Sequence, residues 1–402
     1  MGLKVLMLAW EYPPRLVGGL ARVVCAISQE LTEQGCEVHV VTADHPGTPE
    51  YSIEDGVHVH RVKNQTGPDG EEALTVDFVN WIDKLNFGIL QYAIKLHQES
   101  PFDVVHAHDW LVADAARTMK SFGIPVVSTI HATEFGRNRG GLNSQVSRVI
   151  DQIEWRLIYE SRRVIVNSRH MFEEVKDHFQ APAEKVEIIP NGIDPNRFVS
   201  DQSNADLRAK HGIGEGPVVL FVGRIVEEKG IQVLLDAAPR VLERHPGTTF
   251  LIAGSGYYLD NLKQQADALG IAGNVKFFGQ ANDADLCELY TMADIMTVPS
   301  LYEPFGIVAL EGMAAGLPTI TSDTGGLMDI VQHMTNGLTT YTGDSQSVAW
   351  GLLQVLDDPE FADRIGKQGR SHVKEHFSWK TISARTLEMY QLAIAEVESA
   401  ED

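Results

Sequence analysis

The chain has 402 residues, 44% of them hydrophobic and 8% aromatic, which is typical of globular proteins and long enough for two domains. Its 55 acidic residues outnumber 33 lysines and arginines, and the formal net charge of -22 argues against nucleic acid or an anionic membrane as a partner. Any anionic ligand would need a locally basic pocket.

The chain begins with a short apolar run, Val5 to Trp10, which the pair Pro13-Pro14 follows. This run is too short to span a membrane, and we expect a first strand rather than a signal peptide. The cysteines Cys25, Cys36 and Cys287 lie far apart and form no CxxC pair, as is typical of reduced thiols. We therefore expect a cytoplasmic protein without a membrane span.

Apolar runs of strand length alternate with amphipathic segments through the first half of the chain. The segments Ala21–Glu33 and Val146–Glu160 predict helices. Continuous Val and Ile runs separated by helices are typical of a parallel sheet covered on both faces. The expected strands start at Leu3, Glu37, Phe102, Pro125, Arg163 and Lys185.

The same alternation restarts after a polar connection. NGIDPNRF begins at Asn191 and a polar stretch spans 200–216, so we expect a domain boundary in this region. The last segment, Trp379 to Glu398, predicts a helix that follows a completed second sheet. The second set of expected strands starts at Pro217, Thr248, Asn274, Asp294 and Pro318.

The predicted fold is α/β, with two doubly wound domains. We expect the first domain to span residues 1–195 and the second 196–378, with the helix of residues 379–402 packing back toward the first. Such sheets bind ligands outside the carboxyl ends of their strands. The cleft between the two domains is therefore the expected site.

Gly18 and Gly19 lie where the first strand turns into the first helix. Glycines at such a turn allow backbone N–H groups to approach a phosphate at the helix N-terminus. Any tight turn could use the same pair, and the spacing is not GxGxxG, so a dinucleotide fingerprint is not supported. A second pair, Gly325-Gly326 in SDTGGLMDIV, repeats this arrangement after a strand of the second domain.

Two cations, Arg224 and Lys229, follow the first strand of the second domain in VGRIVEEKG. Five residues apart at the carboxyl end of a strand, they could clamp a diphosphate. The alternative is a solvated loop in which both cations pair with Glu227 and Glu228.

The stretch EPFGIVALE combines two acids with a predicted helix start. Gly306 should open a helix that runs to about Ala315. Glu303 and Glu311 could hydrogen-bond sugar and ribose hydroxyls, or Glu303 could be an ordinary carboxylate at a helix start. The first N–H groups of the helix would form an anion site that needs no metal, near Phe305, Gly306, Ile307 and Val308.

Three histidines follow or end strands of the first domain: His106 and His108 in VVHAHDW, and His131 in TIHATEFG. The HxH pair could suggest zinc, but no third ligand has the spacing of a zinc site. The alternative is that a strand-end histidine is a hydrogen-bonded core residue. We expect His131 to point into the cleft.

These motifs resemble those of the GT-B glycosyltransferases of family 4, over essentially the whole chain. Within that group the chain looks most like the short bacterial and archaeal glycogen (starch) synthases. Starch-synthase relatives carry lysine where this chain has Leu16, beside Arg15, and TGGLMDIV lacks a common Pro-Glu pair. The motifs that carry the resemblance are GGLARVV, HAHDW, TIHATEF, PNGIDPNRF, VGRIVEEKG and EPFGIVALE followed by TGGLMDIV.

The resemblance implies a retaining hexosyltransferase that moves a glucosyl unit from ADP- or UDP-glucose to a glucan, with no metal or other cofactor. On the donor side it implies that Glu303 holds sugar hydroxyls and that Glu311 binds the ribose. Arg224 and Lys229 would neutralise the diphosphate, aided by N–H groups at Gly19 and at the helix start.

The resemblance implies that His131 contacts the sugar near its 6-hydroxyl and is catalytic together with Glu303, Arg224 and Lys229. On the acceptor side it implies that Asp109, with His108, faces the acceptor. The base would be recognised by backbone groups near Phe278 and Gln280. The alternatives are a family 4 transferase with a small or lipid acceptor such as glucose 1-phosphate or fructose, a GT-B nucleotide-sugar epimerase, or a non-catalytic glycan-binding protein.

Overall fold

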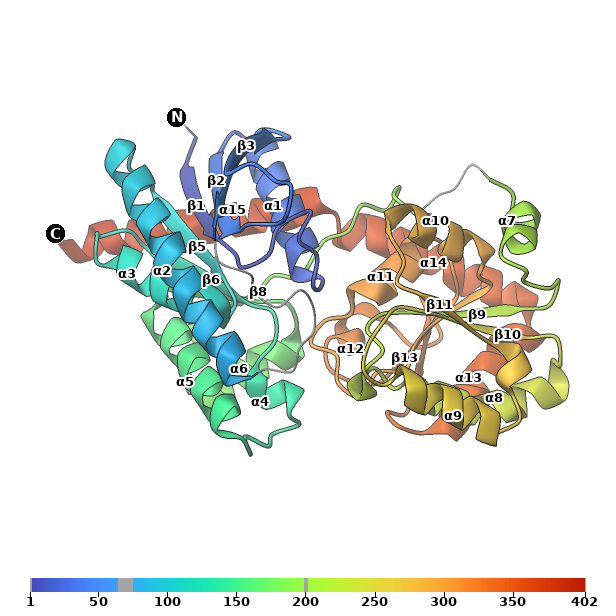
Figure 1. Ribbon diagram of the computed structural model, residues 1–402. Coiled ribbons are helices and arrows are strands. Elements are labelled where there is room, and N and C mark those ends of the chain that lie inside the picture. Colours follow the sequence, from blue (N-terminus) through green and yellow to red (C-terminus); the bar gives the residue numbers. More distant parts are fainter. Residues whose placement is uncertain (1, 64–74, 199–201, 402) are drawn as a thin grey trace. The chain divides into compact units, whose positions relative to one another are not determined.

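The computed structural model describes residues 2–63, 75–198 and 202–401, and the chain divides into two compact units (Figure 1). The first unit contains the chain up to Gly192 together with Trp379 onward, and the second is Ile193–Ser378. The polar stretch that we expected between the domains includes residues 199–201, which lie outside the described residues.

An eight-stranded sheet forms the centre of the first unit, in the order β3-β4-β2-β1-β5-β6-β7-β8. Neighbouring strands are parallel except β3, which is antiparallel to β4. The strands are β1 (Lys4–Leu8), β2 (Glu37–Ala43), β3 (Tyr51–Glu54), β4 (Val57–Val62), β5 (Val104–His108), β6 (Val126–Ile130), β7 (Arg163–Val166) and β8 (Val186–Ile188).

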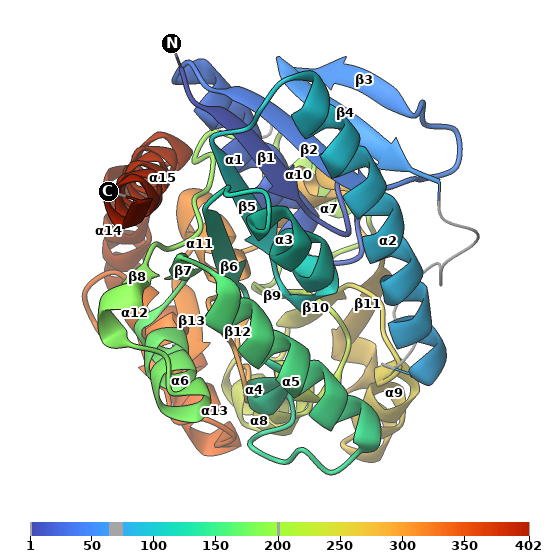
Figure 2. The same cartoon turned by 90° about the vertical axis from the view of Figure 1, so that its left-hand side faces the viewer.

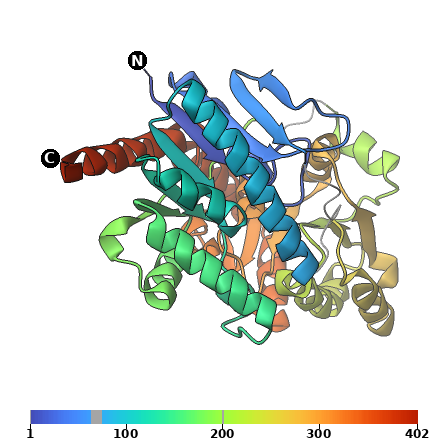
Figure 3. The same ribbon diagram turned by 60° about the vertical axis from the view of Figure 1, so that its left-hand side comes forward.

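Helices cover both faces of this sheet, which explains why its strands are continuous apolar runs. One core cluster joins the sheet to α2 (Val76–Glu99), α3 (Ala113–Lys120), α5 (Gln145–Glu160) and α6 (Arg169–Phe179). Figure 2 shows α2, α3 and α5 in front of the strands, and Figure 3 shows α3 and α5 side by side. The opposite cluster contains α1 (Leu20–Glu33) and α15 (Trp379–Glu401). A short helix, α4 (Glu134–Arg137), follows β6.

The second unit has a six-stranded sheet in which all pairs are parallel, in the order β11-β10-β9-β12-β13-β14. Because β9 lies beside β10 and β12, the loops after these strands meet at one edge. The strands are β9 (Val218–Val222), β10 (Thr249–Ala253), β11 (Val275–Gly279), β12 (Ile295–Val298), β13 (Thr319–Ser322) and β14 (Leu338–Thr340).

Two core clusters lie on the two faces of the second sheet. The first contains α7 (Asn204–Lys210), α10 (Asp283–Met292), α11 (Ile307–Ala314) and α12 (Leu327–Ile330). The second contains α8 (Ile231–Arg244), α9 (Leu259–Ala268) and α13 (Ser345–Asp357). Residues of α14 (Pro359–His376) contribute to both clusters.

The predicted α/β class with two doubly wound sheets is confirmed. The hairpin β3–β4, the short strand β14 and the helix α7 were not among the predicted elements. The hairpin turns at Asp55-Gly56, both with positive φ, which is a turn that suits the twist of paired strands. In the described part of the chain, no helix is long and apolar enough to cross a membrane.

Candidate active site

Lys229 and Glu303 form an ion pair in the second unit. Lys229 follows β9 and its Nζ lies 2.8 Å from Oε2 of Glu303, which follows β12. The two side chains are only 18% and 12% exposed, so water screens the pair less than it screens a surface pair. Ser300 Oγ donates to the same carboxylate oxygen at 3.2 Å. A cation and a carboxylate from different motifs thus form one polar centre, because β9 and β12 are neighbours in the sheet.

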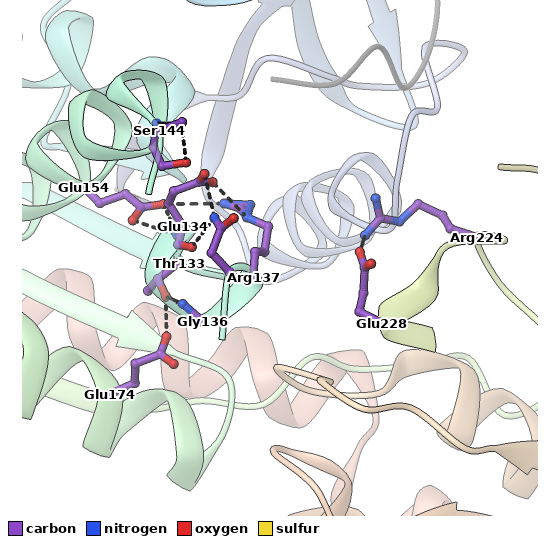
Figure 4. Close-up of polar contacts among 11 residues, drawn as sticks. Thr133, Glu134, Gly136, Arg137, Ser144, Glu154, Glu174, Arg224 and Glu228 are labelled. Atoms are coloured by element: carbon purple, nitrogen blue, oxygen red, sulfur yellow. Dashed lines mark hydrogen bonds and ion pairs between the residues drawn. The ribbon is translucent and has the colours of Figure 1, made fainter. Parts of the chain in front are cut away.

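Arg224 also follows β9 but has a different partner. Its guanidinium nitrogen lies 3.6 Å from Oε1 of Glu228, and the side chain is 46% exposed (Figure 4). This is the surface pairing that the solvated-loop alternative predicted for Arg224, whereas Lys229 pairs with Glu303 instead. A half-exposed pair at this distance contributes little to stability, so an anion can replace Glu228 readily.

Two glycine turns bring backbone against the segment that carries Glu303. Gly325 has φ +54°, and a Cβ there would lie 2.0 Å from the Glu303 carbonyl oxygen. The N–H of Gly326 donates to that oxygen at 2.9 Å. Gly230 has φ +70°, and its Cβ would lie 1.9 Å from the Pro299 carbonyl oxygen. Only glycine permits such close approach, so these turns fix the backbone on which Glu303 stands.

Helix α11 begins at Ile307 and has Gly306 as its cap, with φ +110°. No side chain of the described residues caps this helix start, so its first N–H groups are available to an anion. Phe305 is buried, and Ile307 and Val308 are half-buried. One turn further on, buried Glu311 accepts a hydrogen bond of 2.6 Å from the hydroxyl of Tyr290.

Phe278 and Gln280 lie at the carboxyl end of β11. Phe278 is half-buried, with its ring centroid 5.5 Å from that of His211. Gln280 is exposed. The carbonyl between them, of Gly279, accepts from the N–H of Gly254, which ties this strand end to the loop after β10.

A buried carboxylate organises the Gly18-Gly19 loop in the first unit. Glu11 accepts hydrogen bonds from the N–H groups of Val17 at 2.7 Å, Gly18 at 3.2 Å and Ala21 at 3.3 Å. Burial raises the pKa of Glu11, although these N–H donors and Arg15 oppose the shift. The N–H of Gly18 already has an acceptor in Glu11. The expectation that this loop presents N–H groups to a phosphate therefore no longer includes Gly18 and applies to Gly19.

Arg15 and Leu16 precede this loop. Arg15 is buried, with its guanidinium carbon 5.6 Å from the Trp10 ring centroid and 5.3 Å from that of Trp81. Leu16 is 44% exposed at the position where starch-synthase relatives carry lysine. Arg15 therefore packs among aromatic rings, and its side chain does not replace that lysine at the surface.

His106 is a hydrogen-bonded core residue. Its Nδ1 lies 2.7 Å from the Tyr390 hydroxyl and its Nε2 lies 2.7 Å from the Thr129 hydroxyl. Burial, with a smaller effect of His131, lowers the pKa of His106 to about 3. This is the alternative that we considered for the HxH pair. Among the described residues, no group of three or more His, Cys, Asp and Glu side chains is placed to hold a metal ion.

His108, Asp109 and His131 are in contact at the carboxyl ends of β5 and β6. The Nδ1 of His108 lies 3.1 Å from the Nε2 of His131, and the two rings are stacked. Asp109 has φ +61°, and its carboxylate accepts the backbone N–H of His131 at 2.7 Å. Burial lowers the pKa of both imidazoles, and Asp109 opposes the shift at His131. Both rings are therefore neutral near pH 7.

A second buried carboxylate holds the turn that follows His131. Both oxygens of Glu154 accept the N–H of Glu134 at 2.9 Å, and Arg137 lies 3.4 Å from the same carboxylate (Figure 4). Burial raises the pKa of Glu154 to about 8, against the lowering effects of Arg137 and of the Glu134 N–H. Thr133 caps this turn by accepting the Gly136 N–H, and its hydroxyl donates to Glu174.

Glu11, Glu154, Ser300 and Tyr290 were not singled out from the sequence. Each contacts a predicted site residue or the loop that carries one. Glu11 and Glu154 bind backbone N–H groups, and an acid with that role looks like any other acid in a sequence. The local signal for Glu11 is its place three residues after the end of β1.

Two family models match this chain. Residues 17–197 match Glycosyltransferase Family 4 and residues 203–372 match Glycosyl transferases group 1. An uncharacterized glycosyltransferase from Methanocaldococcus jannaschii is 38% identical, over 98% of this chain and 99% of its own. Glycogen synthase from Mycobacterium tuberculosis is 35% identical, over 97% of this chain and 95% of its own length. D-inositol 3-phosphate glycosyltransferase from Salinispora arenicola is 30% identical, over 94% of this chain and 88% of its own length.

Solved structures share the fold. Sucrose-phosphate synthase from Thermosynechococcus elongatus superposes with a TM-score of 0.83 at 23% identity, over 98% of this chain and all of the other. The catalytic domain of starch synthase IV from Arabidopsis thaliana, bound to ADP and acarbose, gives 0.76 at 20% identity over 98% and 100%.

Proposed function

This chain belongs to glycosyltransferase family 4, with the GT-B fold, and on that basis we propose that it is a retaining enzyme that moves a glucosyl unit from ADP- or UDP-glucose to a glucan. The observation that carries the proposal is the 35% identity to a glycogen synthase across nearly the full length of both chains. The donor class is also supported by the starch synthase IV structure, which contains ADP.

Lys229 and Glu303 are the centre of the proposed donor site. The leaving diphosphate gains negative charge as the glycosidic bond breaks, and Lys229, Arg224 and the N–H groups at the α11 start would stabilise it most in that state. Glu303 would hold hydroxyls of the transferred sugar while its other contact, to Lys229, links it to the diphosphate. Attack from the leaving-group face would retain configuration, so no carboxylate acts as a covalent nucleophile.

The remaining residues would divide the donor and the acceptor between them. Glu311 would bind the ribose, and backbone groups near Phe278 and Gln280 would contact the base. The neutral imidazole of His131 would hydrogen-bond the transferred sugar near its 6-hydroxyl, and the Asp109 carboxylate, which accepts the backbone N–H of His131, would hold the backbone of this residue. The acceptor side would include His108 and Asp109. The N–H of Gly19, which is not among the donors to Glu11, would add a contact to phosphate beside Gly18.

A family 4 transferase with a small acceptor is the second candidate. The 30% identity to D-inositol 3-phosphate glycosyltransferase over 94% of this chain favours it. Leu16, which stands where starch-synthase relatives carry lysine, favours it as well. Both candidates share the donor site, and they differ only in the acceptor.

A matrix of donors and acceptors separates the two candidates. ADP-, UDP- and GDP-glucose would each be offered with glycogen, maltooligosaccharide, glucose 1-phosphate and fructose, and nucleotide release and product would be measured. We expect transfer to glycogen or maltooligosaccharide. Product with only a small acceptor would exclude glucan synthesis, and turnover of donor without any acceptor would indicate an epimerase.

We expect Glu303→Ala and Lys229→Ala each to lower kcat/KM at least about a hundredfold, because a preorganised contact to the transition state contributes on the order of 2.7 kcal/mol. Circular dichroism should show that both variants fold. Lys263→Ala, at an exposed lysine of α9, is the matched control. Near-normal rates in either site variant would show that the assignment is wrong.

A further inference from the structure

A cavity of about 620 Å³ opens at the amino-terminal ends of β6, β7 and β8 in the first unit. Pro125 and Val126 line it at the start of β6, while His131 follows the other end of the same strand. Five strand residues span roughly 16 Å. The cavity is therefore separate from the histidine and aspartate cluster described above.

The cavity is basic, although the chain as a whole is strongly acidic. Four cations line it against three carboxylates, in a chain with 55 acidic and 33 basic residues. The cations are Lys120, Arg162, Arg163 and Lys185, and the carboxylates are Glu160, Glu184 and Glu396.

The carboxylates neutralise these cations incompletely. Arg162 and Arg163 share one carboxylate, since both form ion pairs with Glu396. Lys120 forms an ion pair with Glu160 at 2.8 Å. Lys185 donates to a neutral group, the Tyr159 carbonyl, at 2.8 Å, and no carboxylate of the described residues lies within ion-pair distance of its Nζ. The buried Nε of Arg163 makes no hydrogen bond within the described part of the chain.

Burial, together with the nearby charges of Lys120 and Arg162, lowers the pKa of Lys185 to about 8, against the raising effect of Glu160. The positive charge of Lys185 is thus held in an unfavourable setting. An anion in the cavity would favour the charged lysine and raise this pKa again. Binding an anion near pH 8 should therefore take up protons.

We propose that this cavity binds a phosphate group, either as the free dianion or as the ester of a small molecule. Two guanidiniums and two ammonium groups match the oxygens of a phosphate, since arginine binds such oxygens in pairs and lysine as a point charge. Ile124, Pro125 and Val397 form an apolar wall that fits the body of an ester. The proposal does not depend on the identity of the glycosyl acceptor.

Calorimetric titration of the full-length protein with inorganic phosphate tests the site. At pH 8, in two buffers with different ionisation enthalpies, we expect saturable binding accompanied by proton uptake. Lys185→Met should weaken binding at least tenfold and abolish the proton uptake. Lys120→Met, at the half-exposed rim, gives a second test should the first variant fold poorly, and Lys263→Met in α9 should bind as the wild type does.

The proposed donor site also attracts phosphate, so the titration is repeated with Lys229→Ala. Binding that persists in this variant and is lost in Lys185→Met supports the cavity. Binding that is lost with Lys229 and kept without Lys185, or no saturable binding at all, overturns the proposal. Parallel titrations with glucose 6-phosphate and AMP distinguish the sources, because tighter binding of an ester than of free phosphate shows that the apolar wall contributes.

Discussion

Glu154 is a buried carboxyl group that holds a turn beside His131. Its two oxygens hold the Glu134 N–H, and Asp109 and Glu134 both oppose its ionisation. In the unfolded chain a glutamate loses its proton above its ordinary pKa of 4.5, whereas the folded protein keeps the proton on Glu154 up to a pH of about 8. The stability that this proton contributes is present at low pH and is lost as pH rises from 4.5 through 8.

We expect kcat/KM of the wild type to fall above pH 8, because ionised Glu154 repels Glu134 and Asp109 and loosens the turn after His131. Glu154→Gln keeps an acceptor without charge and should remove this alkaline fall, whereas Glu154→Ala should lower kcat/KM at every pH. The control is Glu99→Gln, at an exposed acid ending α2. A wild-type pH profile in Glu154→Gln would contradict the interpretation.

Gly325 tests whether backbone contact positions Glu303. Gly325→Ala would place a Cβ 2.0 Å from the Glu303 carbonyl oxygen, so we expect Glu303 to move and kcat/KM to drop by tenfold or more. Gly270→Ala is the matched control, because Gly270 has φ +70° with open space around it. Both variants bear the cost of a left-handed alanine, about 1–2 kcal/mol, which thermal unfolding would measure. Equal activity in the two variants would argue against the positioning role.

The charged residues of the candidate site could be predicted from the sequence, but not every residue with which they form an ion pair could. Lys229 and Glu303 were predicted from their places after strands, but their ion pair depends on β9 lying beside β12. Arg224 pairs with Glu228, as the solvated-loop alternative predicted for it. Only the fold shows which of the two nearby cations contacts the Glu303 carboxylate.

Strands β2 and β4 bring three histidines together on one side of the first sheet. His39 Nδ1 lies 3.0 Å from His60 Nε2, and the rings of His39 and His58 stack at 4.5 Å. Burial, together with His39 and His58, lowers the pKa of His60 to about 4. The folded protein therefore keeps His60 neutral at a pH where the unfolded chain protonates it.

We expect the free energy of unfolding to fall as pH drops from about 6.5 to 4. His60 alone should account for up to about 3 kcal/mol, since each unit of pKa difference corresponds to about 1.4 kcal/mol. Denaturant unfolding of His60→Gln at pH 7 and 4.5 should show a smaller loss than the wild type. His376→Gln, exposed at the end of α14, should behave as the wild type does. An unchanged loss in His60→Gln would exclude this histidine as the cause.

Among the elements, the long apolar strands and the amphipathic helices could be predicted from the sequence. The short strands could not. Helices α1, α5 and α15 lie within a few residues of their predicted ends. Strand β14 has three residues, and hairpin strand β3 alternates half-buried with exposed side chains. Such segments depend on a neighbouring strand for their hydrogen bonds, so their own sequence carries little signal.

Across the whole molecule, the chain leaves the first unit after Gly192 and returns to it at Trp379. The second unit is one continuous segment with its own two core clusters. The first unit is discontinuous, because Ile382, Met389 and Tyr390 of α15 belong to its core. The two units should therefore differ in their dependence on the C-terminal helix.

A chain that ends at Ser378 should lose the folded first unit and keep the second. The three large α15 side chains contribute about 5 to 9 kcal/mol by burial, and the Tyr390 hydroxyl also satisfies His106. Calorimetry should show one unfolding transition fewer than in the full chain. A chain that ends at Val397 keeps these side chains and should show the same number of unfolding transitions as the full chain. Two transitions in the shorter chain would contradict this division of the core.

The sequence by itself determined the α/β class, the family and the places of the site motifs, because buried runs, glycine turns and strand ends are local patterns. The family resemblance is confirmed by matches over both halves of the chain. The tertiary structure decided what each charged group contacts. Lys229 and Glu303 are 74 positions apart, and Glu11 and Glu154 bind backbone of other elements. Such contacts follow from strand order and burial, which no local stretch of sequence contains.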